Sequence, residues 1–190
     1  MRKIFLDIGA YNGVSVEFFL KNYPASQGFE IFSFECDKRN IKTIKDKNLP
    51  IELIEAAAWS SNGMQKYYHG KDDGGTLYES KKTGGISRLK FYWVETIDLA
   101  EFIKDNFNKT DYIIVKMNCE GAEYELIPHL KAKGLIGWVD LWFVQWHNEK
   151  INIHKTIHDT VRNMINSFQW ECQGKDAKFT KAFKKFINNE

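Results

Sequence analysis

The sequence lacks the features that mark several large classes of protein. Its three cysteines, Cys36, Cys119 and Cys172, are odd in number and far apart, which predicts neither a disulfide framework nor a zinc site and favours a reducing cytoplasm. No apolar run has the length of a membrane span, and no charged-then-apolar signal peptide precedes Ile4. The net charge is only +2, so neither a nucleic acid nor a membrane is expected as a partner.

Repeats and linker-like stretches are also missing, so we expect one domain over residues 1–190. Met1 to Lys3 leave almost nothing before the first apolar run, as in a minimal domain or in a piece of a longer polypeptide. What the sequence does have is aromatic residues: 14 Phe, 8 Tyr and 6 Trp. They predict a core built on aromatic rings and favour an aromatic-lined pocket.

The beginning of the chain has the pattern of a strand, a glycine turn and a helix. Ile4 to Ile8 is apolar apart from Asp7, Gly9 to Gly13 has a glycine at both ends, and Val14 to Leu20 carries apolar residues at helical spacing. This order is typical of the first unit of a nucleotide-binding α/β domain. Glycines let the backbone approach a ligand closely, and the start of the helix offers unpaired N–H groups.

The spacing of the glycines bears on which ligand binds. Gly9 and Gly13 form G-x-x-x-G and not the G-x-G-x-x-G that holds a pyrophosphate. Asp7 would repel a phosphate but would suit a cationic amino acid, which favours S-adenosylmethionine (SAM) over NAD. A tight turn that binds no ligand is the alternative at this stage.

Two further strand ends supply candidate contacts for a nucleoside. The strand from Phe29 ends on Glu35, about twenty residues after the glycine turn, where a carboxylate accepts hydrogen bonds from ribose hydroxyls. The strand 51–56 runs into Ala57, Ala58 and Trp59, which predict a flat slot for adenine. Trp59 as an ordinary core residue is an equally good interpretation.

The rest of the chain alternates between strands and helices. Residues 60–95 are a long glycine-rich polar segment with short strands at 65–68 and 91–94, and we interpret it as a flap on the substrate side. Strands are predicted at 112–117, 139–144 and 168–172, and helices at 37–47, 99–106, 123–130 and around 157–168, with Ile157, Val161, Ile165 and Phe168 on one face. Residues 179–187 have helical spacing, with a final antiparallel strand as the alternative.

This alternation predicts an α/β fold: a single doubly wound, mostly parallel sheet with helices on both faces. In such sheets ligands bind beyond the carboxyl ends of the strands, at the point where the strand order reverses. The glycine turn, Glu35, residues 57–59, residues 118–120 and residues 145–147 all follow strands, so we expect them to line one edge.

These residues resemble the FkbM-type SAM-dependent methyltransferases, which have the Rossmann-like class I methyltransferase fold. The matching stretches are 5–13, 34–35, 57–59, 95–99, the block Lys-Met-Asn-Cys-Glu-Gly-Ala-Glu at 116–123, and Trp-His at 146–147. The resemblance covers about residues 4–148 and implies O-methyl transfer, commonly to hydroxyls of sugars or of glycosylated and polyketide products. This chain has Asn118 where the family usually has Asp, and Gln145 where it usually has Glu.

From the motifs and the resemblance we predict two sets of site residues. The catalytic candidates are His147 and Glu120 as bases and Lys116 as a group that steadies a developing alkoxide. A structural histidine and a lysine paired with a carboxylate are the alternatives. The predicted SAM contacts are Asp7, Gly9, Ala10, Tyr11, Asn12, Gly13, Ser15, Glu35, Cys36, Ala57, Ala58, Trp59 and Asn118.

A divalent metal, Mg²⁺ or Mn²⁺, is compatible with the sequence but not implied by it. Its candidate ligands are Asn118, Glu120 and His147, and the two amides weaken such a site because hard cations prefer charged oxygens. The leading hypothesis is a SAM-dependent O-methyltransferase acting on a sugar or glycan hydroxyl. The alternatives are a SAM-binding protein with weak or lost catalysis and a methyltransferase for a non-carbohydrate small molecule. The low net charge argues against a nucleic-acid methyltransferase, and the glycine spacing argues against a nicotinamide dehydrogenase.

Overall fold

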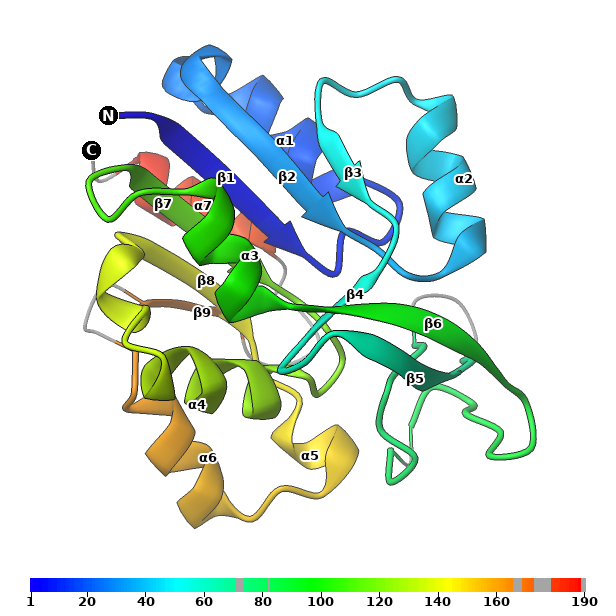
Figure 1. Cartoon of the computed structure of the whole chain (residues 1–190). Helices are drawn as coiled ribbons and strands as arrows, with labels where there is room; N and C mark the ends of the chain where they lie inside the picture. The colour runs from blue at the N-terminus through cyan, green and yellow to red at the C-terminus, as the bar shows by residue number, and fades with distance from the viewer. Residues whose placement is uncertain (71–73, 82, 166–168, 173–178, 189–190) are drawn as a thin grey trace.

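The computed structural model describes residues 1–70, 74–81, 83–165, 169–172 and 179–188. Within these residues the strands form two sheets, and helices cover both faces of the larger one (Figure 1). The strands are β1 (Lys3–Ile8), β2 (Phe29–Phe34), β3 (Glu52–Ile54), β4 (Ala57–Trp59), β5 (Gly63–Tyr68), β6 (Phe91–Asp98), β7 (Tyr112–Met117), β8 (Leu141–Gln145) and β9 (Gln169–Cys172). The helices are α1 (Val14–Asn22), α2 (Lys38–Asp46), α3 (Leu99–Asn106), α4 (Glu123–Ala132), α5 (Asn148–Ile151), α6 (Lys155–Arg162) and α7 (Phe179–Ile187), with 3₁₀ turns at Pro24–Gly28 and Ile136–Trp138.

In the described part of the chain, the larger sheet has the strand order β3-β2-β1-β7-β8-β9, and every neighbouring pair is parallel. The chain adds β2 and β3 on one side of β1 and then crosses to add β7, β8 and β9 on the other side. The strand order therefore reverses between β1 and β7, which is where α/β sheets bind ligands. The predicted fold class, a doubly wound parallel sheet, is confirmed.

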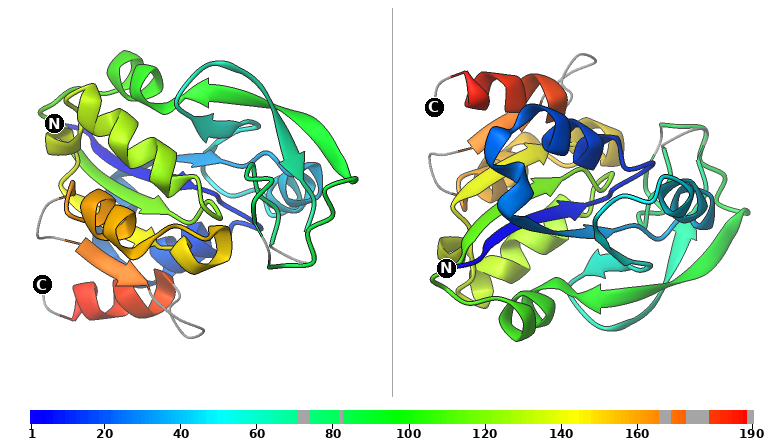
Figure 2. Two further views of the ribbon diagram at one scale, coloured as in Figure 1. Left: turned by 90° about the horizontal axis from the view of Figure 1, so that it is seen from below. Right: turned by 90° about the horizontal axis from the view of Figure 1, so that it is seen from above.

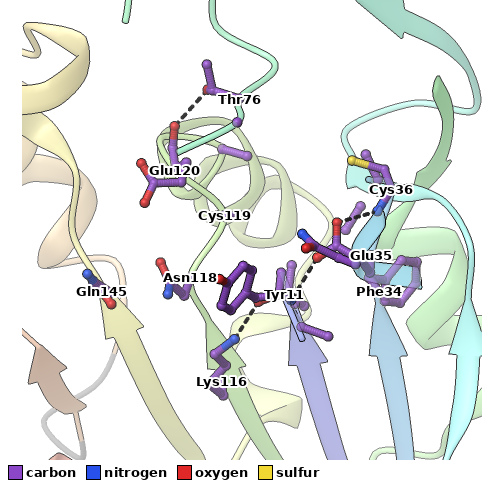
Figure 3. A pocket seen from close by; sticks show the side chains of 18 of the residues that line it. Tyr11, Phe34, Glu35, Cys36, Thr76, Lys116, Asn118, Cys119, Glu120 and Gln145 are labelled. Carbon is purple, nitrogen blue, oxygen red and sulfur yellow. Dashed lines mark hydrogen bonds between the residues drawn. The ribbon is translucent and has the colours of Figure 1, made fainter. Parts of the chain in front are cut away.

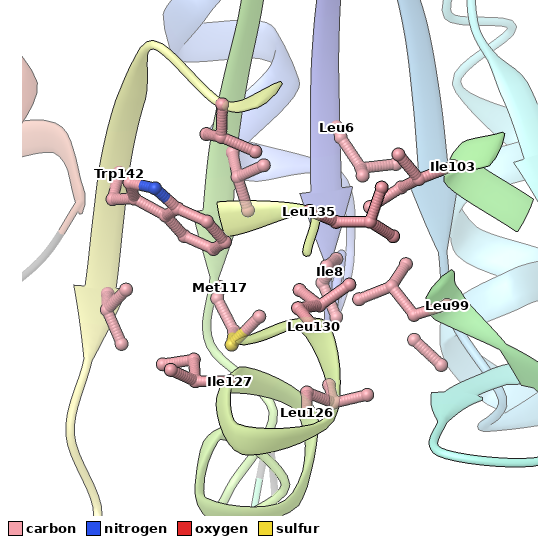
Figure 4. Packing of buried hydrophobic residues seen from close by; sticks show 14 of the residues in the cluster. Leu6, Ile8, Leu99, Ile103, Met117, Leu126, Ile127, Leu130, Leu135 and Trp142 are labelled. Carbon is pink, nitrogen blue, oxygen red and sulfur yellow. The ribbon is translucent and has the colours of Figure 1, made fainter. Parts of the chain in front are cut away.

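Alternation along β1 explains why both faces of the sheet are covered. Ile4, Leu6 and Ile8 point to one face, where they join the buried apolar side chains of α3 and α4 (Figure 4). Phe5 points to the other face and stacks on Phe19 of α1, with ring centroids 4.2 Å apart. Because successive side chains of a strand point to opposite faces, a strand that is apolar throughout needs a helical layer on each side.

A second, smaller sheet with the order β4-β6-β5 is a feature that the sequence did not predict. Of the strand predicted over 51–56, residues 52–54 form β3, which pairs with β2 in the large sheet. Residues 57–59, predicted to follow that strand, form a separate strand, β4, which pairs with β6. β5 and β6 are antiparallel, with Gly63 opposite Thr96. Figure 2 shows this small sheet beside the carboxyl ends of the large sheet and not stacked on it.

The last third of the chain differs from the prediction in two places. α6 ends at Arg162, so Ile165 is buried beyond the helix, and Ile157 is 51% exposed and does not face the core. Phe168, the fourth residue of that predicted face, lies outside the described residues. Residues 179–187 are helix α7 with Phe179, Phe183 and Phe186 buried, so the antiparallel-strand alternative is wrong. No helix in the described part of the chain has both the length and the apolar character needed to cross a membrane.

Candidate functional site

A cavity of about 410 Å³ lies at the carboxyl ends of β1, β2, β7 and β8, in the size range of small-molecule sites. It lies where the strand order reverses, as the fold predicts. Among the predicted site residues, those that line it are Gly9, Ala10, Tyr11, Ser15, Glu35, Cys36, Ala57, Ala58, Lys116, Asn118 and Glu120. Figure 3 shows Glu35 and Cys36 on one side of this pocket and Asn118, Glu120 and Gln145 on the other.

The glycine turn is held close to the neighbouring strand ends. Gly9 has a φ of 79°, and a Cβ at this position would lie 2.1 Å from the carbonyl oxygen of Asn118. The N–H groups of Gly9 and Ala10 both donate to the carbonyl of Phe34, at 3.1 and 3.0 Å. The turn is therefore fixed between the ends of β2 and β7, and only glycine fits at its first position.

Asp7 has a different surrounding from the one predicted. Its carboxylate is fully buried, does not line the cavity, lies 2.7 Å from the ammonium of Lys116 and accepts a 2.7 Å hydrogen bond from Ser15. Lys116 is the neighbour of Asp7 across the β1–β7 pair and also donates to the carbonyl of Gly9 at 2.6 Å. This placement does not support the prediction that Asp7 contacts the ligand, because the lysine already compensates its charge.

Three other predicted contacts also lie away from the cavity. The side-chain oxygen of Asn12 accepts from the N–H of Val14 at 3.2 Å and so belongs to the start of α1. Gly13, with a φ of 80°, occupies the N-cap of the same helix. Trp59 packs edge-on against Tyr78, with centroids 5.8 Å apart, and joins the core. Its interpretation as a core residue is the correct one, and the alanines beside it line the cavity.

Glu35 is prepared to accept hydrogen bonds inside an apolar surrounding. Its carboxylate accepts from the backbone N–H groups of Tyr11 (2.7 Å), Cys36 (2.9 Å) and Asp37 (2.7 Å). Burial raises the pKa of Glu35 to about 7, although the N–H groups of Asp37 and Tyr11 act to lower it. Tyr11 has a φ of 54°, an uncommon conformation for a residue with a side chain, which aims its N–H at this carboxylate.

The wall around Glu35 includes residues that the sequence did not single out. Ala56, Tyr67 and the stretch Gly75 to Leu77 all line the cavity. The last of these belongs to the glycine-rich segment that was interpreted as a flap, so that segment does reach the site. Phe179 and Thr180 of α7 also line it, and no motif in the sequence could have indicated that.

His147 is placed differently from the prediction that it acts as a base. Its side chain is completely buried and does not line the cavity. Nδ1 lies 2.9 Å from Glu123, and Nε2 lies 3.2 Å from Glu120. Burial acts to lower the pKa of His147, but the two carboxylates outweigh it and raise the pKa to about 9. This pKa favours the cationic ring at neutral pH, so the placement of His147 does not support its interpretation as a neutral base.

Glu120 lies at the centre of a cluster of positive charges. Besides His147, its carboxylate contacts the ammonium of Lys81 at 2.5 Å and that of Lys150 at 2.9 and 3.1 Å. Burial acts to raise the pKa of Glu120, but His147 and Lys81 hold it well below its usual range. A carboxylate stabilised in this way is a poor proton acceptor. Its backbone is also unusual, with a φ of 51° and its carbonyl bonded to Thr76 at 2.8 Å.

Sequence reasoning missed three members of this cluster: Lys81, Glu123 and Lys150. Glu123 was noted only as the last residue of the 116–123 block and the first of a predicted helix, and the lysines are far from Glu120 in sequence. The predicted metal ligands do not fit a divalent cation, since three positive groups already surround Glu120 and both His147 nitrogens face carboxylates. Within the described residues, no group of three His, Cys, Asp or Glu side chains is arranged to hold a metal ion.

The parallel sheet, its glycine turn after β1 and the acidic residue after β2 together define a class I methyltransferase-like α/β domain. The model of the methyltransferase FkbM domain matches residues 7–172, and the chain belongs to this family. It is therefore a methyltransferase-family protein, as the resemblance implied.

Comparison with solved structures gives a more distant similarity. The crystal structure of methyltransferase FkbM from Methylobacillus flagellatus KT is similar to this chain at 15% sequence identity and a TM-score of 0.43. The similarity covers 70% of this chain and 30% of that one, so the chain spans about a third of the length of that protein. No match is found among proteins with a curated description.

Proposed function

We propose that this protein is a SAM-dependent O-methyltransferase whose acceptor is a hydroxyl of a sugar or glycan. The observation that carries the SAM assignment is Glu35, a buried carboxylate with acceptor capacity beside an apolar slot, facing a glycine turn at the point of strand-order reversal. A carboxylate in this place accepts hydrogen bonds from ribose hydroxyls. The family supports methyl transfer, and the sugar acceptor rests on the resemblance alone.

Different lining residues would contact three different parts of the cofactor. Glu35 would hold the ribose, Ala57 and Ala58 would pack on the adenine, and the turn from Gly9 to Tyr11 would receive the methionine end. When bound, SAM supplies an electrophilic methyl group. Asp7 would act indirectly: its carboxylate holds the ammonium of Lys116, which donates a hydrogen bond to the carbonyl of Gly9.

The acceptor would lie at the side of the cavity formed by Asn118, Glu120 and Gln145. Because His147 is a cation that lies outside the cavity and Glu120 is compensated, we expect Asn118, Glu120 and Gln145 to align the acceptor oxygen more than to remove its proton. Alignment of two reactants is by itself a large contribution to rate. Lys116 lines the same cavity, but its ammonium is engaged by Asp7 and Gly9, so a direct contact with the acceptor would be an additional role.

A second candidate is a SAM-binding protein with weak or lost catalysis. It is favoured by one observation, the neutralisation of Glu120 by Lys81, Lys150 and His147. The two candidates share SAM binding and differ only in turnover.

As to location, the free thiols of Cys36 and Cys119 support the proposal of a reducing, cytoplasmic compartment.

The proposal is tested in two steps. First, S-adenosylhomocysteine should raise the melting temperature of the protein, while NAD at the same concentration should not. Glu35→Ala should abolish the shift, and Glu30→Ala, which changes an exposed residue of the same strand, should keep it. Second, a mass-spectrometric screen of glycans with SAM should detect a methyl increment. A protein that binds the cofactor but methylates no glycan would leave the second candidate, and the lack of any shift would refute both.

A further inference from the structure

Tyr67 is a residue of the cavity wall whose hydroxyl has no hydrogen-bond partner among the described residues. The residue is only 8% exposed. A buried tyrosine hydroxyl usually has a partner, and a ligand pocket is mostly apolar with a few polar groups that orient the ligand. The hydroxyl of Tyr67 is therefore available to a molecule that enters the cavity.

The small sheet directs Tyr67 toward the cavity. Successive side chains of β5 point to opposite faces, and Lys66 lies on the outer face, with its ammonium 4.4 Å from the ring centroid of the exposed Phe91. Tyr67 lies on the other face, opposite Tyr92 of β6, and the centroids of these two rings are 5.3 Å apart. The alternation of the strand thus fixes the direction of the Tyr67 ring.

The glycine-rich segment holds the end of this ring in place. A Cβ at Gly75 would lie 1.9 Å from the hydroxyl oxygen of Tyr67, so the backbone of the segment passes directly beside the hydroxyl. The next residue, Thr76, exchanges two backbone hydrogen bonds with Tyr68, at 2.8 and 3.1 Å. Because the segment is attached to β5 at this point, the position of the hydroxyl does not depend on a bound ligand.

The surroundings of Tyr67 belong to the nucleoside side of the cavity. Tyr67 and Ala57 lie in one apolar cluster, against which Cys36 and Leu77 pack, and all four line the cavity. Burial raises the pKa of Tyr67, and Cys36 and Glu35 raise it further, so the hydroxyl keeps its proton at neutral pH. Since the base of a nucleoside is attached to its ribose, and Glu35 is the residue proposed to hold the ribose, the ring that enters this cluster would be the adenine.

We propose that Tyr67 selects the base of the cofactor and that its hydroxyl forms a hydrogen bond with the polar edge of adenine. Adenine has ring nitrogens that accept and an amino group that donates, and a tyrosine hydroxyl can take either role. A base without the matching atom would leave the hydroxyl buried and unpaired, which is how such a site rejects analogues. This inference rests on the proposed function and deepens it, because it assigns a further contact of the same cofactor.

Two variants that each remove a single oxygen test the role of the hydroxyl. Tyr67→Phe should weaken the binding of adenosine, measured by calorimetry at pH 8, about fivefold, the ratio that one hydrogen bond provides. Tyr92→Phe is the matched control, because the hydroxyl of Tyr92 is also buried without a described partner but Tyr92 does not line the cavity. Its affinity for adenosine should equal that of the unmodified protein.

Analogues of adenosine identify the atom of the base and keep the test independent of how well a variant folds. 1-Deazaadenosine, 3-deazaadenosine and 7-deazaadenosine each lack one ring nitrogen, and purine riboside lacks the amino group. At least one of the four should bind the unmodified protein about fivefold more weakly than adenosine does. Tyr67→Phe should remove the difference for that analogue, because the two changes delete the same hydrogen bond.

The inference and the proposed function fail in different ways. If adenosine binds but Tyr67→Phe leaves its affinity unchanged, or if none of the four analogues binds more weakly than adenosine, the inference is wrong and the cofactor assignment stands. The inference is also wrong if Tyr92→Phe loses as much affinity as Tyr67→Phe, or if every analogue keeps its full loss in Tyr67→Phe. If neither adenosine nor S-adenosylhomocysteine binds to the unmodified protein, the proposed function itself is refuted.

Discussion

Lowering the pH from 8 to 6 should weaken the binding of adenosine to this protein about tenfold. The ribose hydroxyls would donate to the carboxylate of Glu35, and these hydrogen bonds are much stronger when Glu35 is ionised than when it is protonated. Burial raises the pKa of this group to about 7. The ionised fraction then falls from about nine tenths at pH 8 to about one tenth at pH 6, and the affinity falls with it.

The direction of the effect follows from linkage. A ligand that binds the ionised form lowers the pKa of Glu35, so binding releases a proton near neutral pH and strengthens as the pH rises. Adenosine is the better probe than S-adenosylhomocysteine, because it has the ribose but no α-amino group that titrates in the same range. A tenfold change corresponds to about 1.4 kcal/mol, well within the precision of calorimetry.

Two matched controls make the assay decisive. Glu35→Gln should bind adenosine more weakly and with no pH dependence between 6 and 8. 2′-Deoxyadenosine, which lacks one of the two hydroxyls, should bind the unmodified protein less tightly and respond less to pH. A dissociation constant that stays flat across this range in the unmodified protein, or an equal slope in Glu35→Gln, would refute the assignment of Glu35 to the ribose.

Three further predictions concern stability. Gly9→Ala places a Cβ 2.1 Å from the backbone carbonyl that follows β7, at a φ of 79°, so it should lower the free energy of unfolding by about 2 kcal/mol or more and abolish cofactor binding. Gly28→Ala, with no atom within 4 Å of the new Cβ, is the control, and urea titration measures the stability of both variants. Asp7→Asn leaves the buried ammonium of Lys116 without its counter-ion and should lower the free energy of unfolding by about 3–5 kcal/mol. Glu30→Gln, which breaks the exposed ion pair with Arg2, should lower it by less than about 1 kcal/mol, and equal losses in the two variants would contradict the prediction. Because its pKa is about 9 instead of 6.5, His147 should contribute about 3 kcal/mol to the free energy of unfolding below pH 6.5, and this contribution is lost as the pH rises through 9. His147→Gln should flatten that part of the profile of stability against pH, and an unchanged profile would show that another group is responsible.

The placement of the residues proposed to bind the nucleoside follows from local sequence. The Gly9 turn and Glu35 each come directly after a buried strand, and parallel strands place their carboxyl ends at one edge. For such residues, identifying the preceding strand is enough to place them at that edge of the sheet. The same holds for the core, because the alternation of Ile4, Phe5 and Leu6 already requires a helix layer on both faces.

The chemistry at the other side of the cavity was decided by the tertiary structure. Sequence reasoning chose His147 as a neutral base because an isolated imidazole has that property at pH 7. Folding places it between Glu123 and Glu120, and the two carboxylates make it a cation. The pKa of a buried group depends on its neighbours in space, which the order of residues does not reveal.

Asp7 shows the same division within the most recognisable motif of the chain. The sequence alone determined that β1, the Gly9 turn and α1 follow one another, and hence predicted that a small ligand binds beside the turn. Only the pairing of β1 with β7 brought Lys116 within 2.7 Å of Asp7 and turned a candidate ligand contact into a buried ion pair. Local geometry is encoded by neighbours along the chain, whereas charge compensation is decided by neighbours across the sheet.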